Sequence, residues 1–140
     1  MTDTALAPIH IAAAVLMRAD GQTLLVRKRG TDAFMQPGGK IGPGETALAA
    51  LLRELREELG LAIPADQPRY LGRFTAPAAH EPGFMVAADL FRVETSETPE
   101  AAAEIAEIIW VDPAHTADLK LAPLTRDICA TMASCTADEA

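Results

Sequence analysis

The chain has 140 residues, of which 49% are hydrophobic and 23% are charged, and its formal net charge is -8 at pH 7. This length predicts a single domain over residues 1–140 that folds without disulfides or a structural metal, and the apolar fraction excludes a disordered chain. No apolar run approaches the ~20 residues that span a bilayer, and the acidic balance argues against a nucleic-acid polymer as the main partner, because binding a phosphate backbone needs a basic surface.

The N-terminal third of the chain predicts two strands and a loop. Residues 9–17 are apolar, residues 18–21 have turn composition, and residues 23–29 predict a second strand that pairs back as a hairpin. Residues 36–44 hold four glycines and two prolines, so we expect a loop there.

A helix is predicted over residues 46–59, which contain no glycine or proline, and Gly60 supplies its stop signal. Five leucines recur at helical spacing and predict the buried stripe: Leu48, Leu51, Leu52, Leu55 and Leu59.

The second half predicts three strands and a closing helix. The strands cover residues 70–75, 84–93 and 105–111, and the helix covers residues 121–133. This order of elements predicts an α/β fold, with a mixed sheet and helices packed on it.

Three glutamates of the central helix, Glu54, Glu57 and Glu58, fall in a sector of ~100°, which we expect to face outward from the leucines. Carboxylates this close repel one another unless a cation lies between them, and hard oxygen ligands suit Mg²⁺ or Mn²⁺. The alternative is an ordinary solvated helix face, in which Arg53 pairs with Glu57 at i,i+4.

The loop before the helix favours the metal site. Pro37, Gly38 and Gly39 allow the main chain to approach a ligand closely. Glu45 lies at the helix start, where it can stabilise the helix dipole or reach Arg53 two turns later.

The spacing over residues 39–61 is distinctive: Gly, five residues, Glu, seven residues, Arg-Glu-apolar, one residue, Glu-Glu, one residue, Gly-apolar. It resembles the signature box of the Nudix hydrolases at every defined position. The resemblance implies a Nudix-type α/β/α sandwich. It also implies hydrolysis of the diphosphate in a nucleoside diphosphate linked to a group X.

The resemblance also implies a role for each polar residue of the box. Glu54, Glu57 and Glu58 would bind Mg²⁺, or Mn²⁺ as an alternative, together with the main-chain carbonyl of Gly39 or of Gly38. Glu45 and Arg53 would be structural and would hold the loop against the helix.

Four cationic residues precede the glutamates and suggest a phosphate clamp: Arg27, Lys28, Arg29 and Lys40. By strand alternation Arg27 and Arg29 share one face and Lys28 takes the other. We expect Arg27, Arg29 and Lys40 to bind substrate, and the resemblance favours Arg27 and Lys40 for the phosphates. The alternative is that these cations protect a strand edge from aggregation.

The catalytic carboxylates are expected among Glu57, Glu58 and Glu104. The resemblance implies a general base downstream of the box, where Glu104 lies just before the last predicted strand and Glu107 lies within it. We choose Glu104, because a side chain at a loop-to-strand edge can extend over a site. Glu58 is the alternative base, and a solvated role for the downstream glutamates is the other reading.

The box does not identify the group X. The small size of the chain favours members that cleave (d)NTPs or oxidised nucleotides such as 8-oxo-dGTP. Pro77, sixteen residues after the box, favours the alternative of an ADP-ribose or nucleotide-sugar pyrophosphatase. A non-catalytic nucleotide-binding module is a further alternative. We expect a cytoplasmic protein with a small-molecule nucleotide as its partner and no membrane contact, and we leave a homodimer open.

Overall fold

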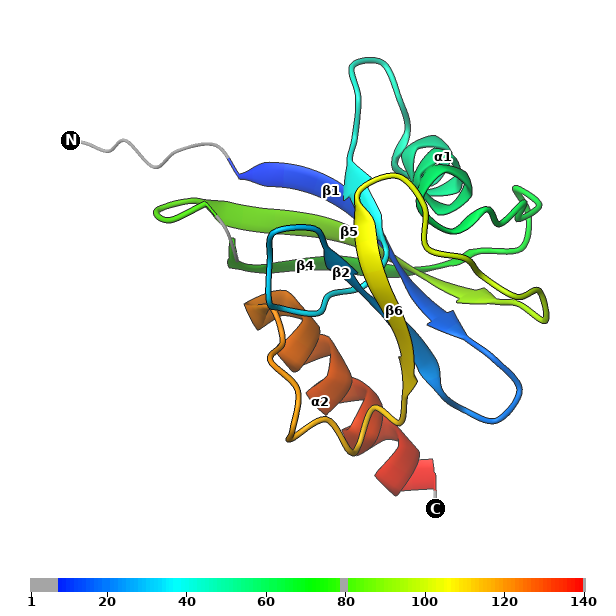
Figure 1. The fold of residues 1–140 in the computed structure, drawn as a ribbon, viewed down its shortest axis with the longest axis vertical. Helices are drawn as coiled ribbons and strands as arrows, with labels where there is room; N and C mark the ends of the chain where they lie inside the picture. The colour runs from blue at the N-terminus through cyan, green and yellow to red at the C-terminus, as the bar shows by residue number, and fades with distance from the viewer. Residues whose placement is uncertain (1–7, 79–80, 140) are drawn as a thin grey trace.

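The computed structural model describes residues 8–78 and 81–139, and for residues 133–139 it describes the backbone only. Eight elements follow in chain order (Figure 1): β1 (Ile9–Met17), β2 (Thr23–Lys28), β3 (Gly38–Lys40), α1 (Ala47–Leu59), β4 (Arg69–Pro77), β5 (Met85–Glu94), β6 (Ile105–Val111) and α2 (Pro123–Glu139). No helix in these described stretches combines the length and the apolar character needed to cross a bilayer.

All six strands form one mixed sheet with the order β4-β5-β1-β2-β6, and β3 pairs with β1 beside this path. β1 and β5 run parallel, while the other pairs are antiparallel. The predicted hairpin of β1 and β2 is confirmed, with Met17 opposite Thr23. The mixed sheet expected from the element order is therefore confirmed.

The glycine-rich segment differs from the prediction. Its central residues form the short strand β3, with Gly39 opposite Ala12 and Gly38 opposite Ala13. A Cβ on Gly38 would lie 2.1 Å from the Ala12 carbonyl oxygen. The glycines that indicated a loop instead allow the two main chains to approach, so the expectation of a loop over all of residues 36–44 is wrong.

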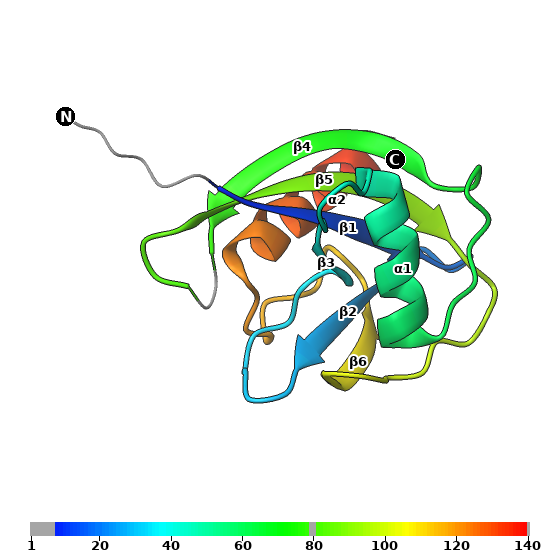
Figure 2. The ribbon, with the colours of Figure 1, turned by 90° about the horizontal axis from the view of Figure 1, so that it is seen from above.

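The helices cover opposite faces of the sheet, as Figure 2 shows. Beneath α1 lies a core that includes Leu16, Val26 and Phe91. On the other face Val15 and Leu90 pack against Leu124 and Ile128 of α2. Alternate residues of each strand thus enter the two cores, which gives the expected α/β/α sandwich.

Both ends of α1 are capped, and the predicted stop at Gly60 is confirmed. Thr46 is the N-cap, and its side chain accepts a hydrogen bond from the Ala49 N–H at 3.1 Å. Gly60 ends the helix in the left-handed conformation, with φ of 69°. Three of the five predicted leucines, Leu51, Leu55 and Leu59, are fully buried, whereas Leu48 and Leu52 are half-buried at the margin of the stripe.

α2 extends to Glu139, six residues beyond its predicted end. No glycine or proline follows Pro123, so no sequence signal stops the helix.

Candidate functional site

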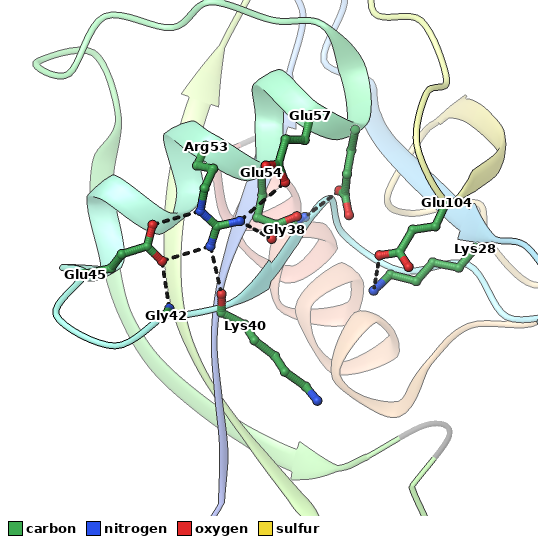
Figure 3. A network of polar contacts seen from close by, with 10 residues as sticks. Lys28, Gly38, Lys40, Gly42, Glu45, Arg53, Glu54, Glu57 and Glu104 are labelled. Carbon is green, nitrogen blue, oxygen red and sulfur yellow. Dashed lines mark hydrogen bonds and ion pairs between the residues drawn. The ribbon is translucent and has the colours of Figure 1, made fainter.

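The centre of the site is the Arg53 guanidinium, which joins α1 to the loop before it (Figure 3). Its Nε and Nη2 donate to the two carboxylate oxygens of Glu45, both at 2.8 Å. Nη2 also donates to the Lys40 carbonyl oxygen at 3.2 Å, and Glu45 accepts from the Gly42 N–H at 2.7 Å. The Arg53 hydrogen bonds and then that from Gly42 lower the pKa of Glu45 to about 2. This bidentate pair fixes the loop against the helix.

The same guanidinium reaches two of the predicted metal ligands. Its Nη1 lies 2.8 Å from Glu54 Oε2 and 3.4 Å from Glu57 Oε1. The Arg53–Glu57 contact is the i,i+4 pair considered for a solvated helix face, but here it belongs to a network of three carboxylates. Arg53 therefore compensates part of the repulsion among them.

Glu58 departs from its predicted outward position: only 2% of it is exposed. Its Oε1 accepts a hydrogen bond from the Gly38 N–H at 3.2 Å, and its Oε2 is buried without a hydrogen-bond partner. Burial, followed by the charge of Glu54, raises the pKa of Glu58 to about 8. The physical reason lies in the spacing, because Glu58 follows Leu51 by seven residues and so shares the buried side of the helix.

Gly39 provides the space for Glu54. A Cβ at this position would lie 2.5 Å from the Glu54 carboxyl carbon, a distance that real Cβ contacts essentially never show. The glycine thus brings the main chain of β3 directly against a carboxylate of α1. The sequence predicted that the main chain of this loop approaches a ligand closely; the contact with Glu54 was not foreseen, and the approach to a ligand stays a prediction.

The donor set fits a hard divalent cation. No three His, Cys, Asp or Glu side chains in the described ranges are already grouped as a metal site. Hydrogen bonds account for this, since Glu54 and Glu57 point to Arg53 whereas Glu58 points to Gly38. All the donors are nevertheless oxygens, the type that a hard divalent cation prefers, and one Glu58 oxygen is buried without a hydrogen-bond partner.

Lys28 and Glu104 form an ion pair of 3.4 Å at one side of this cluster (Figure 3). Lys28 follows the buried residues Leu24 and Val26 on the α1 side of the sheet. The charge of Lys28 lowers the pKa of Glu58, whereas that of Glu104 raises it, so both act on the same carboxylate. Lys28 is not among the three predicted substrate-binding cations, although its alternation with Leu24 and Val26 could have indicated this face.

The three predicted substrate-binding cations lie elsewhere. Arg27 is on the opposite face of β2, where its Nε donates to Glu107 at 3.2 Å and its Nη1 to the Thr31 carbonyl oxygen at 2.8 Å. The exposed Lys40 ammonium is 4.0 Å from Glu81, and Arg29 is exposed just after β2. The structure does not bring their side chains to the carboxylates of α1, and their substrate contacts stay predictions.

Comparisons with known proteins agree with this geometry. The family model described as NUDIX domain matches residues 8–131. An RNA pyrophosphohydrolase of Halorhodospira halophila is 48% identical over 52 residues, which cover 37% of this chain and 28% of that protein. The chain therefore spans little more than a quarter of the length of this curated relative.

Two solved structures share the fold. A MutT protein from Methanosarcina mazei superposes with a TM-score of 0.75 at 22% identity, covering 91% of this chain and 94% of the other. A nudix hydrolase family member from Chromobacterium violaceum gives a TM-score of 0.73 at 29% identity, with 91% and 78% covered.

Proposed function

The chain belongs to the Nudix family, and from this premise we propose that it is a Mg²⁺-dependent pyrophosphohydrolase of small-molecule nucleotides. The observation that carries the proposal is the buried Glu58 carboxylate, one oxygen of which has no hydrogen-bond partner and whose pKa is raised by burial and by the charge of Glu54. A buried carboxylate that lacks a partner is costly in a purely structural helix. A metal-binding role accounts for its presence.

Mg²⁺ would be held by Glu54, Glu57 and Glu58, with a main-chain carbonyl from Gly39 or Gly38. When bound, it supplies positive charge for the diphosphate and lowers the pKa of bound water. Arg53 orients Glu54 and Glu57 through its hydrogen bonds. Mn²⁺ offers the same octahedral oxygen coordination and is the alternative ion.

Glu104 is proposed as the general base. The water oxygen forms a bond to one phosphorus, the bridging P–O bond breaks, and the water proton passes to the Glu104 carboxylate. The 62% exposure of the Glu104 side chain leaves room for substrate and water beside it. Glu58 is the alternative base, acting directly from α1.

For the substrate we propose a (d)NTP or an oxidised nucleotide such as 8-oxo-dGTP, bound with help from Arg27, Arg29 and Lys40. The net charge of -8 supports a small nucleotide over a polymer, although the Halorhodospira halophila relative carries an RNA activity in its name. ADP-ribose is the second candidate, supported by the position of Pro77 at the end of β4. A non-catalytic nucleotide-binding module is the third. We further propose that residues 1–140 form a single domain and that the protein is cytoplasmic.

Product analysis against a nucleotide panel tests the proposal. Purified protein with Mg²⁺ is given 8-oxo-dGTP, the four dNTPs, ADP-ribose, diadenosine polyphosphates and RNA with a 5′-triphosphate, with Glu57→Gln in parallel. We expect monophosphate and pyrophosphate from the triphosphates, lost in the variant. AMP and ribose phosphate would favour the second candidate, whereas binding without turnover would favour the third.

A further inference from the structure

A β-bulge brings Lys28 and Glu104 together. Arg27 pairs with Glu107 and Lys28 with Ile105, so Ala106 is an extra residue on β6. Such a bulge shifts the alternation of side chains by one. Ile105 therefore enters the core beneath α1, where it is 2% exposed, instead of facing the side of Glu107.

The backbone of Glu104 is fixed on both sides. Its carbonyl oxygen accepts a hydrogen bond from the Arg29 N–H at 2.8 Å. The preceding residue, Ala103, has a φ of +55°, a conformation that costs energy for a residue with a Cβ. One residue earlier, the Ala102 N–H donates to the Glu58 carbonyl oxygen at 2.9 Å. Glu104 is thus tied to β2 and to the end of α1 that carries Glu58.

This placement creates a conflict of roles for Glu104. Glu104 lies near the end of α1 that carries Glu58, so its carboxylate would be drawn to a divalent ion held there. A carboxylate bound to metal is a poor proton acceptor. Lys28 is the cation that already pairs with Glu104, at 3.4 Å, and with 31% of its side chain exposed it is the more buried partner. The Lys28 ammonium can hold the Glu104 carboxylate next to the proposed metal ligands and prevent it from becoming one of them.

We propose that Lys28 is a positioning residue, which keeps the Glu104 carboxylate out of the metal's ligand shell and available to accept the proton from water. This inference rests on the proposed function. It goes beyond that function because it assigns a role to Lys28, a residue that lies outside the signature box.

A double-mutant cycle on metal affinity tests the inference without turnover. Mn²⁺ dissociation constants are measured by calorimetry for the wild type, Lys28→Met, Glu104→Gln and the double variant. We expect Lys28→Met to tighten Mn²⁺ binding by about tenfold, because Glu104 becomes a ligand, and to have a much smaller effect in the Glu104→Gln background. An equal gain in both backgrounds would overturn the inference, since Lys28 would then act by its charge alone.

Turnover gives the second readout. Lys28→Met should lower kcat by about 10²-fold with little change in KM, and should not lower the kcat of Glu104→Gln further. Lys28→Arg should restore most of the loss. The control is Arg92→Met, which removes a comparably exposed ion pair on β5 and should leave kcat unchanged. A change in KM alone, or additive losses, would overturn the positioning role.

The two measurements distinguish a failure of the proposed function from a failure of the role assigned to Lys28. If no compound of the panel is hydrolysed, the proposed function fails, and the Mn²⁺ cycle still decides the role of Lys28. Melting temperatures of all variants should match that of the wild type, because the pair is partly exposed and contributes little stability.

Discussion

Glu45 and Glu58 lie at opposite ends of α1, and their carboxylates are in opposite states. Both oxygens of Glu45 accept hydrogen bonds from Arg53, and the pKa of Glu45 is lowered to about 2. Glu58 has one hydrogen bond, from Gly38, and one oxygen without a partner, and its pKa is raised to about 8. The charged form of the carboxyl group is therefore favoured at Glu45 and disfavoured at Glu58.

This difference distinguishes a structural carboxylate from one that is available to bind a cation. A carboxylate whose bonds are complete gains nothing from a further ligand, so Glu45 serves to hold the loop. A buried carboxylate with an unmet bond is where a cation gains most. We therefore propose that the reaction takes place at the Glu58 end of α1. Each of the following variants tests one end of the helix or the core that supports both.

The largest effect is expected from Glu57→Gln, which removes the charge of a proposed metal ligand at the Glu58 end of α1. We expect kcat to fall by about 10³-fold with the melting temperature unchanged, because the Glu57 side chain is exposed and its pair with Arg53 contributes little stability. Arg56→Gln, an exposed neighbour on the same helix, is the control and should keep full activity. Normal turnover in Glu57→Gln would contradict the assignment of the site.

Leu55→Ala weakens the hydrophobic core beneath α1, which supports both ends of the helix. Leu55 is 0% exposed beneath α1, so its truncation leaves a cavity and should lower the free energy of unfolding by roughly 2–5 kcal/mol. Denaturant unfolding measures this value. A free energy within error of the wild type would show that the leucine face of α1 does not carry the packing described here.

A pH-dependent effect is expected at Glu58 in protein freed of metal with EDTA. Its folded pKa of about 8 lies above the ordinary 4.5, so between these values the folded state keeps a proton that the unfolded state has lost. Stability should therefore fall as the pH rises from 4.5 to 8, by about 1.4 kcal/mol per pH unit at most.

Glu58→Gln should abolish this component, so the variant becomes more stable than the wild type above neutral pH. Melting temperatures from pH 5 to pH 9 give the comparison. Parallel curves for the two proteins would mean that burial does not raise the pKa of Glu58.

The smallest effect is expected at Glu45, whose pair with Arg53 is partly open to solvent. Its pKa is below the ordinary value, so it adds stability above pH 4.5 that is lost as the pH falls toward 2. Glu45→Gln should flatten the acid side of the stability curve slightly and leave its alkaline side unchanged. Acid unfolding followed by circular dichroism would reveal the difference, and a change confined to alkaline pH would contradict it.

Much of the fold could be predicted, because periodicity and stop signals are local. The helix from Thr46 to Gly60 and the order of the main strands follow from spacing alone. The pairing of Gly38 with Ala13 could not be predicted, since glycines that allow a loop equally allow two strands to approach.

The site was predicted by the identity of its residues and less well by their environment. The positions of Glu54 and Glu57 follow from the helical angle, yet the same pattern placed Glu58 outward. Glu58 stands seven residues after Leu51 and three after Leu55, at an apolar position of the stripe, and this signal could have indicated its burial. Lys28 and Glu104 meet next to a β-bulge, which no local sequence pattern predicts.

The most direct test of the central claim is anomalous diffraction from crystals grown with Mn²⁺, recorded near the manganese absorption edge. The account predicts an ion bound by the carboxylates of Glu54, Glu57 and Glu58, with the Glu104 carboxylate next to Lys28 and outside the ligand shell. Mn²⁺ bound elsewhere, with Glu58 still buried and without a cation, would contradict the account.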